Sequence, residues 1–176
     1  MIVYKYLTHT CVLKYSSIRF TQPGALNDPF ETFPCYSEYR PFLIDELAKK
    51  YGGSFPPETV PTLKSTVDET IARIQDKLGK HFGILSLTKN NKNGLMWAHY
   101  ANSHKGYVIG FDSGSPFFND GKGVNGLRDV KYSCQRAVVP YGGLKTYDAD
   151  GLADAHENFF FTKSENWRYE EELRII

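Results

Sequence analysis

The sequence predicts an α+β fold with a mixed, largely antiparallel sheet and flanking helices. Short segments rich in aromatic and β-branched residues alternate with helical segments, but without the regular strand–helix–strand rhythm of a parallel sheet. Residues 62–81 repeat apolar side chains at spacings of four, four, three and four, which is the period of an amphipathic helix. Residues 166–176 alternate in the period-two pattern of a strand.

Composition limits the classes of function. A chain of 176 residues is expected to form a single domain with its own core, and a net charge of +1 gives no general attraction to nucleic acid or anionic membranes. Cys11, Cys35 and Cys134 are far apart and odd in number, which indicates a reducing compartment and predicts a cytoplasmic protein. No run of 18 apolar residues is present, so no membrane partner is expected.

The expected elements follow the chain in order. A proline near its start and glycines after its end support a helix at 41–51, and runs of aromatic residues support the predicted strands. We expect strands at 2–6, 18–21, 82–88, 107–111, 129–133, 136–141 and 166–176, and helices at 41–51, 62–81, 96–104 and 148–161.

The segment 95–112 is the one around which we arrange the others. Its first part is a predicted helix, 96–104, that places Trp97, Tyr100 and His104 within a turn of one another, with Gly106 as the expected helix stop. A predicted core strand follows directly. A helix with this density of polar and aromatic side chains suggests a role beyond packing.

The charged face of the last strand is a candidate for catalysis. Period two places Glu170, Glu172 and Arg174 on one face, with the two carboxylates about 7 Å apart. Such carboxylates can stabilise an oxocarbenium-like transition state or bind Mg²⁺. The alternative is a strand face on which Glu and Arg pair without a catalytic role.

Further candidates lie at Asn27-Asp28-Pro29, which forms either a rigid turn or a ligand-binding loop. His99 and His104 are five residues apart, but no cysteine half of a zinc site accompanies them, so no metal site is predicted. Ser86 and Thr88 share one face of their strand but lack a nucleophile-elbow sequence. Trp97 and Tyr100 are either core aromatics or rings that stack on a flat ligand.

Four stretches in a fixed order span nearly the whole chain. They are Val3-Tyr-Lys-Tyr6; Ile18-Arg-Phe-Thr21 with Leu26-Asn-Asp-Pro-Phe-Glu31; Ser86-Leu-Thr88 with Met96-Trp-Ala-His-Tyr-Ala101, His104-Lys-Gly-Tyr107 and Phe111-Asp112; and Trp167-Arg-Tyr-Glu-Glu-Glu-Leu-Arg-Ile175. Together they resemble the bacterial domain of unknown function 2971 family (DUF2971). Members of that family usually continue beyond the last stretch, so we expect this chain to be truncated at its C-terminus.

The order of elements is also similar to the ADP-ribosyltransferase fold, with an early polar strand, a middle strand bearing Ser or Thr before a helix, and a late Glu-x-Glu strand. This resemblance implies an NAD-consuming transferase or glycohydrolase, as in bacterial toxins and phage-defence effectors, with NAD as substrate and a protein or nucleic acid as acceptor. It assigns Lys5 or Tyr6, Ser86 and Thr88 to NAD binding, Tyr100 to stacking, and Glu170 and Glu172 to catalysis. Those enzymes typically carry Arg or His where this chain has Lys5-Tyr6.

Two other functions stay open at this point. A metal-dependent nuclease or hydrolase would draw its ligands and bases from Asp28, Glu31, His99, Glu170 and Glu172. A non-catalytic sensor or interaction module would use the aromatic-rich surface. In each case we expect the loop at 27–31, the helix at 96–104 and the strand at 170–174 to meet in one cleft. The structural alternative is a polar network that stabilises the fold.

Overall fold

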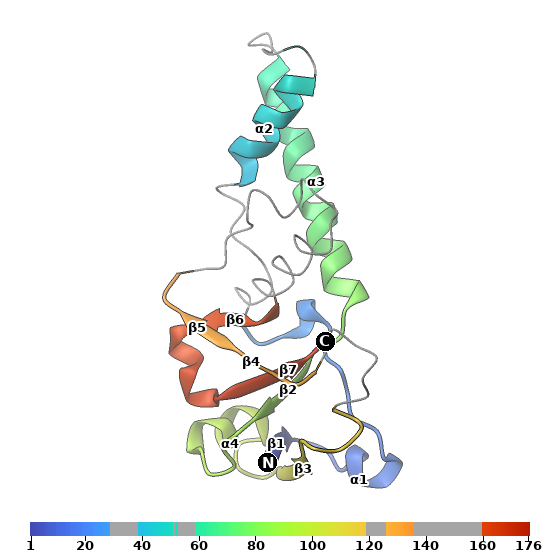
Figure 1. Cartoon of the computed structure of the whole chain (residues 1–176), viewed down its shortest axis with the longest axis vertical. Helices are drawn as coiled ribbons and strands as arrows, with labels where there is room; N and C mark the ends of the chain where they lie inside the picture. The colour runs from blue at the N-terminus through green and yellow to red at the C-terminus, as the bar shows by residue number, and fades with distance from the viewer. Residues whose placement is uncertain (29–38, 51, 53–58, 119–125, 136–159) are drawn as a thin grey trace.

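The chain is known from a computed structural model, which describes residues 1–28, 39–50, 52, 59–118, 126–135 and 160–176 (Figure 1). Its main feature is a five-stranded sheet of order β3-β1-β2-β7-β4 in which all neighbours are antiparallel. The strands are β1 (Ile2–Leu7), β2 (Leu85–Thr88), β3 (Tyr107–Asp112), β4 (Arg128–Asp129) and β7 (Glu172–Ile175). A second, parallel pair consists of β5 (Lys131–Ser133) and β6 (Thr162–Ser164). The predicted α+β class with a mixed, largely antiparallel sheet is confirmed.

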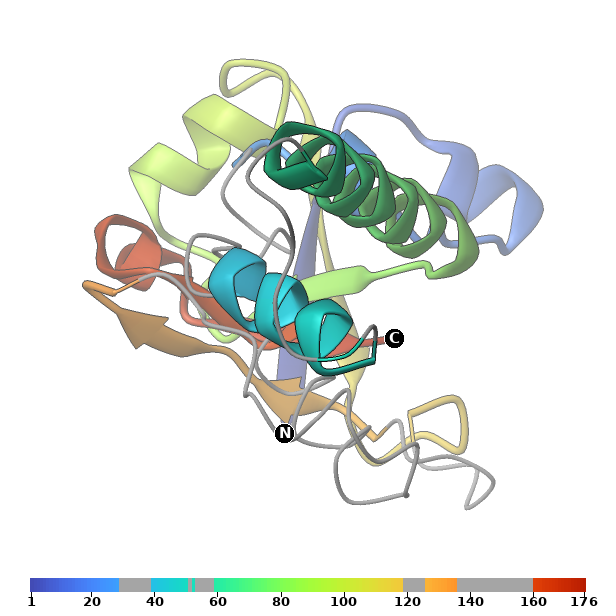
Figure 2. The same cartoon turned by 90° about the horizontal axis from the view of Figure 1, so that it is seen from above.

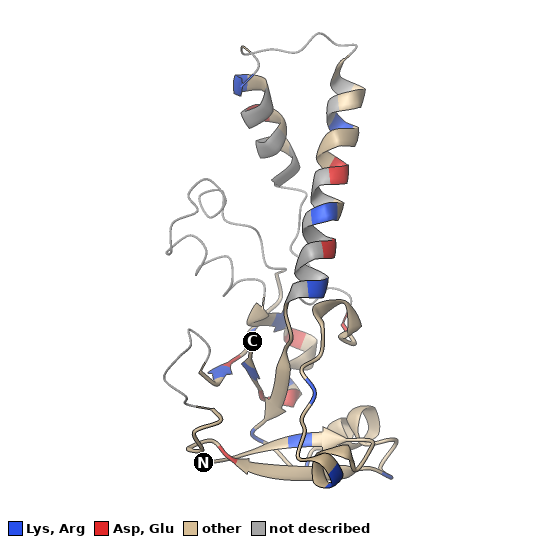
Figure 3. Ribbon diagram, turned by 90° about the vertical axis from the view of Figure 1, so that its right-hand side faces the viewer, with Lys and Arg blue, Asp and Glu red and all other residues tan. Residues whose placement is uncertain are grey.

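The helices lie around this sheet. They are α1 (Cys11–Tyr15), η1 (Pro23–Ala25), α2 (Tyr39–Lys50), α3 (Val60–His81), α4 (Gly94–Tyr100) and η3 (Glu165–Glu170), of which η1 and η3 are 3-10 helices. Helices α2 and α3 run side by side away from the sheet (Figures 1 and 2). Charged residues of both signs alternate along α3 (Figure 3), which is typical of a solvent-facing helix surface. Within the described residues, no helix combines the length and apolar character needed to cross a bilayer.

Two apolar clusters hold the sheet. One contains Val3, Leu85, Leu87, Leu173 and Ile175, all buried, from the three central strands β1, β2 and β7. The other lies beneath α4 and joins Tyr6, Met96 and Ala101, with Trp97 and Tyr100 packed against it. The first cluster fixes the three strands against one another, and the second fixes α4 against β1.

Five predicted elements were wrong in extent. The predicted strand at 129–133 is divided between β4 and β5, which belong to different sheets, and the predicted strand at 82–88 begins only at Leu85. The predicted strand at 18–21 is reduced to a single bridge between Thr21 and Ile84. The predicted helix at 96–104 ends at Tyr100, because Asn102, Ser103 and His104 all adopt positive φ angles, so Gly106 is not its stop. The predicted strand at 166–176 begins only at Glu172, and the residues before it form η3. The predicted strand at 136–141 lies outside the described residues, as does the predicted helix at 148–161 up to residue 159.

Candidate functional site

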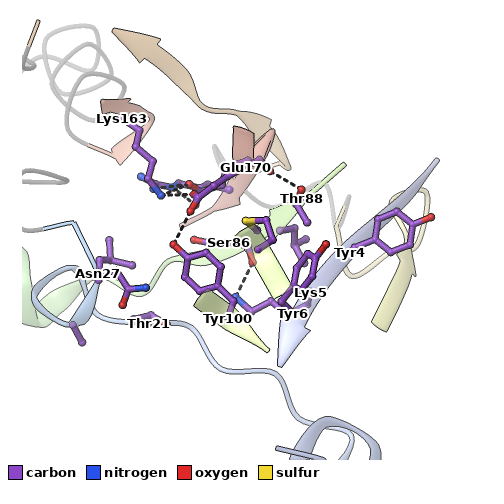
Figure 4. A pocket seen from close by; sticks show the side chains of 16 residues that line it. Tyr4, Lys5, Tyr6, Thr21, Asn27, Ser86, Thr88, Tyr100, Lys163 and Glu170 are labelled. Carbon is purple, nitrogen blue, oxygen red and sulfur yellow. Dashed lines mark hydrogen bonds and ion pairs between the residues drawn. The ribbon is translucent and has the colours of Figure 1, made fainter. Parts of the chain in front are cut away.

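A cavity of about 190 Å³ lies where β1, β2, β7, α4 and the segment after Thr21 meet (Figure 4). Its lining combines aromatic rings, hydroxyl groups and five charged side chains. The lining residues are Tyr4, Lys5, Tyr6, Thr21, Ala25, Leu26, Asn27, Ser86, Leu87, Thr88, Met96, Tyr100, Lys163, Glu170, Glu172 and Arg174. The charged groups and hydroxyls are contributed by segments far apart in the sequence, as the sequence predicted for a single cleft.

Strand register explains why several of these side chains meet. Tyr4 lies opposite Thr88, and Thr88 lies opposite Glu172, so one row of residues crosses β1, β2 and β7. In the next row Ser86 lies opposite Arg174. Directly opposed residues of antiparallel strands point to the same face, so the hydroxyls of β2 and the charges of β7 share one side of the sheet.

The charged groups form one buried network. Lys163 Nζ donates to Glu170 Oε2 at 2.5 Å and to Glu172 Oε2 at 3.1 Å. Arg174 clamps Glu172 with two bonds, Nε to Oε1 at 2.8 Å and a terminal nitrogen to Oε2 at 3.0 Å. All four side chains are at most 6% exposed. A buried carboxylate is costly unless it is paired, and here each one contacts at least one cation.

Glu170 joins this network although it does not belong to the strand. It is the last residue of η3, and Glu171 takes a left-handed conformation with φ of 45° before β7 begins. The Thr88 hydroxyl donates to the Glu170 main-chain carbonyl at 2.5 Å and so fixes this turn against β2. The expected face shared by Glu170, Glu172 and Arg174 is therefore formed by a turn and a strand rather than by a strand alone.

Tyr100 brings α4 into the site. Its hydroxyl donates to Glu170 Oε1 at 2.6 Å. Burial and the negative charge of Glu170 raise the pKa of Tyr100 far above its usual value, while the nearby Asn27 side chain acts in the opposite direction. At neutral pH Tyr100 is therefore a neutral donor that connects α4 to the carboxylate network.

The two lysines of the cavity have pKa values shifted in opposite directions. Burial disfavours the charged form of Lys163, but Glu172 and Glu170 more than offset this and hold its pKa above the usual value. Burial lowers the pKa of Lys5 to about 8, and Arg174 and Arg19 add to this effect while Glu172 opposes it. Lys5 Nζ donates to the main-chain carbonyl of Ser86 at 2.7 Å.

Three predicted site residues do not line the cavity. His99 is exposed, and its ring lies 6.1 Å from those of Tyr100 and Trp167. Trp97 packs edge-on against Tyr6 at 5.5 Å and donates to the carbonyl of Asn91. Asp28 is buried and its charge faces Arg174. Glu31, another predicted member, lies outside the described residues.

Lys163 is the main site residue that the sequence analysis missed. It lies in the three-residue strand β6, after three phenylalanines, where nothing distinguishes it from a surface lysine. Its role depends on β6 pairing with β5, which places its ammonium group beside two carboxylates. Tyr132 was also missed: its hydroxyl accepts the backbone N–H of Glu172 at 2.8 Å and so supports the start of β7.

The fold and the cavity define an α+β protein with a buried, charge-paired cavity beside an antiparallel sheet. Residues 96–175, from α4 to β7, match the family model described as "Protein of unknown function (DUF2971)". The resemblance to that family is thus confirmed over this stretch. No curated protein and no solved structure matches the chain, so the similarity to ADP-ribosyltransferases gains no support from these comparisons.

Proposed function

We propose that this cavity binds NAD by its nicotinamide–ribose end and that the protein consumes NAD, as a transferase or a glycohydrolase. One observation carries the proposal: hydroxyl and charged groups from three adjacent strands, β1, β2 and β7, converge on one cavity together with Tyr100. Ser86 and Glu172, two of the residues that the resemblance to ADP-ribosyltransferases assigns, both line it.

The size of the cavity limits which part of NAD enters. Pockets that enclose a drug-sized ligand have volumes of roughly 300–1,000 Å³. The cavity of about 190 Å³ therefore accepts one end of a dinucleotide rather than the whole molecule. The ring of Tyr100 supplies flat apolar surface for nicotinamide, and in this arrangement the ribose would lie beside the carboxylates.

Hydrogen-bonding capacity favours Glu170 over Glu172 as the carboxylate that contacts the ribose. Glu172 already accepts two bonds from Arg174 and one from Lys163, so three of its roughly four acceptor sites are occupied. Glu170 accepts one bond from Tyr100 and one from Lys163, so each of its oxygens retains a lone pair. We assign Glu170 to stabilising the positive charge that develops as nicotinamide leaves, and Glu172 to holding Lys163 and Arg174 in place.

Release of nicotinamide from NAD tests this assignment. Glu170→Gln keeps an acceptor for Tyr100 but removes the charge, so we expect turnover to fall by about 10²–10³-fold. Glu165→Gln, on the same 3-10 helix, is the matched control, because Glu165 pairs with Arg168 at the surface and lies outside the cavity wall. Full turnover in a folded Glu170→Gln protein would refute the role of Glu170. Absence of turnover in the wild-type protein, with every tested acceptor, would refute NAD consumption.

A second candidate function is non-catalytic ligand binding, which the pairing of Glu172 with two cations favours. A carboxylate that accepts three bonds from Lys163 and Arg174 is already stabilised without a substrate, as expected in a network that shapes a binding cavity. Stabilisation of the fold by NAD without nicotinamide release would identify this case. The metal-dependent hydrolase gains no support: among the described residues, no three His, Cys, Asp or Glu side chains are grouped so as to hold a metal ion.

A further inference from the structure

We propose that Lys5 is a carbonyl-reactive amine, which forms a reversible imine with small aldehydes or ketones that enter the cavity. This activity is distinct from NAD consumption and does not depend on it. Lys5 lies in the middle of β1 and contributes to the cavity wall beside Tyr4, Tyr6 and Ser86 (Figure 4).

The contacts of Lys5 differ from those of the other two cations in the cavity. Lys163 and Arg174 are each ion-paired to a carboxylate. Lys5 makes no ion pair with any residue that the structure describes, and its ammonium group donates to one carbonyl, that of Ser86. That bond holds the nitrogen at the cavity wall and uses only one of its N–H groups, so the nitrogen can still contact a ligand.

The charges around Lys5 favour the neutral, nucleophilic amine. Burial is the largest influence and lowers the pKa to about 8; Arg174 and Arg19 act in the same direction, and Glu172 and Glu170 act against it. A lysine that is desolvated or lies beside another cation is the usual form of an activated amine nucleophile. Arg19 is exposed and is not part of the cavity wall, so its charge can be removed without altering the cavity.

The expected gain in reactivity follows from the fraction of free amine. At pH 7, lowering the pKa from 10.5 to about 8 raises the neutral fraction roughly 300-fold. Nucleophilicity falls with basicity, by about 10-fold over this range if amines follow the slope of about 0.4–0.5 known for thiols. The net advantage of Lys5 over an ordinary surface lysine is then on the order of 10-fold.

The step needs no oxidant or reductant. The lone pair of Lys5 Nζ attacks the carbonyl carbon, so that a C–N bond forms as the C=O π bond breaks and its electron pair moves to oxygen; the oxygen then takes a proton while the nitrogen loses one. Loss of water from this carbinolamine gives the imine, and addition of water reverses it. The cavity of about 190 Å³ restricts the substrate to small carbonyl compounds.

Reductive trapping tests the proposal. The wild-type protein is treated at pH 7 with propanal and cyanoborohydride, which reduces an imine to a stable secondary amine, and labelled lysines are quantified by peptide mass spectrometry. We expect Lys5 to be labelled on the order of 10-fold faster than the exposed Lys14 and Lys105. Labelling of Lys5 at or below the rate of those two lysines would overturn the proposal.

Two variants make the test specific. Lys5→Arg keeps the positive charge but lacks a nucleophilic amine, so the fast label should disappear while Lys14 and Lys105 are labelled as before. Arg19→Gln leaves Lys5 in place and removes a charge that lowers its pKa, so labelling of Lys5 at pH 7 should slow. An unchanged rate in Arg19→Gln would contradict the electrostatic origin of the reactivity. This second arm still decides the question if Lys5→Arg does not fold.

Discussion

Lys163 contacts both carboxylates of the cavity and lies 5.0 Å from the centre of the Trp167 ring. The side chain is almost fully buried, with 5% of its surface exposed. Two carboxylates this close repel each other, and Arg174 pairs with only one of them. Lys163 is therefore the cation that the two carboxylates share.

Replacing Lys163 with Met should strongly destabilise the protein. The substitution leaves Glu170 without its cation, and breaking a buried pair by removing one partner typically costs about 3–5 kcal/mol. Chemical denaturation measures this loss. Lys89→Met is the control, because Lys89 pairs with Asp129 at the surface and should cost less than about 1 kcal/mol. Equal effects of the two substitutions would contradict the proposed role of Lys163.

Lys5 should leave a signature in the pH dependence of stability. Its pKa is about 8 in the folded protein, against 10.5 for the ordinary side chain, so the folded state disfavours the charged amine. The penalty is complete below pH 8 and is relieved as pH rises from 8 to 10.5, because only the unfolded chain then retains the proton. We expect the unfolding free energy of the wild type to rise relative to Lys5→Met by about 1–3 kcal/mol across this window.

Denaturation series at several pH values for wild type, Lys5→Met and Lys14→Met measure this difference. The exposed Lys14 provides the comparison, with a difference from wild type that should stay nearly constant. A constant difference for Lys5→Met as well would show that the pKa of Lys5 is not lowered on folding.

The pattern of neighbouring residues in the sequence identified some residues of the cavity but not others. Ser86 and Thr88 followed from alternation along one strand, and Glu170 and Glu172 from their spacing near the end of the chain. Lys163 depends on a short parallel strand pair formed across a long separation, so no local pattern points to it. His99 was misleading because a histidine on a polar-aromatic helix does not reveal which side of that helix faces the sheet.

At the scale of elements, α4 and the turn after it orient Tyr100 toward the carboxylates. Asn93 caps α4 by accepting from the backbone N–H groups of Leu95 and Met96, and its amide donates to the Tyr169 carbonyl. The helix therefore begins at a residue that is also bonded to η3. It ends early because the chain turns at 102–104 and returns to β3 through Gly106, whose N–H donates to the Ala101 carbonyl at 2.7 Å.

Gly106→Ala should disrupt this turn. A Cβ at this position would meet the Leu7 carbonyl oxygen and approach main-chain atoms of Ala101 to 2.8 Å, and backbone atoms do not move aside easily. We expect a loss of about 1–3 kcal/mol by thermal denaturation. Gly94→Ala is the matched control, since nothing lies within 4 Å of its Cβ and alanine favours a helix. Tolerance of both substitutions would show that the close approach at Gly106 is absent.

The elements that could be predicted are those whose own residues show a clear helix or strand pattern. The amphipathic period placed α3 to within two residues at its start, and aromatic and β-branched runs placed β1 and β3. Residues 166–170 show the same alternation as a strand, yet they form a 3-10 helix closed by a bond from the Glu171 N–H to the Arg168 carbonyl. The left-handed conformation of Glu171, a non-glycine residue, has no signal in the sequence.

At the scale of the whole molecule, the order of strands in the sheet creates the cavity. Strands β1, β2 and β7 are far apart in the sequence but adjacent in the sheet, so hydroxyl groups and charges from distant motifs lie side by side. The convergence of these motifs could be predicted from their polar character, but the strand order could not. Helices α2 and α3 extend away from the cavity and leave its described wall to the sheet, α4 and the segment after Thr21 (Figure 1).

The central claim, that this cavity binds NAD, is tested most directly by thermal unfolding of the wild-type protein titrated with NAD. At 100 times its dissociation constant, a ligand that binds only the folded state adds about 2.7 kcal/mol of stability. We predict a saturable rise in melting temperature with NAD, weakened in Tyr100→Phe, which loses the hydrogen bond to Glu170. An unchanged melting temperature at millimolar NAD would contradict the claim.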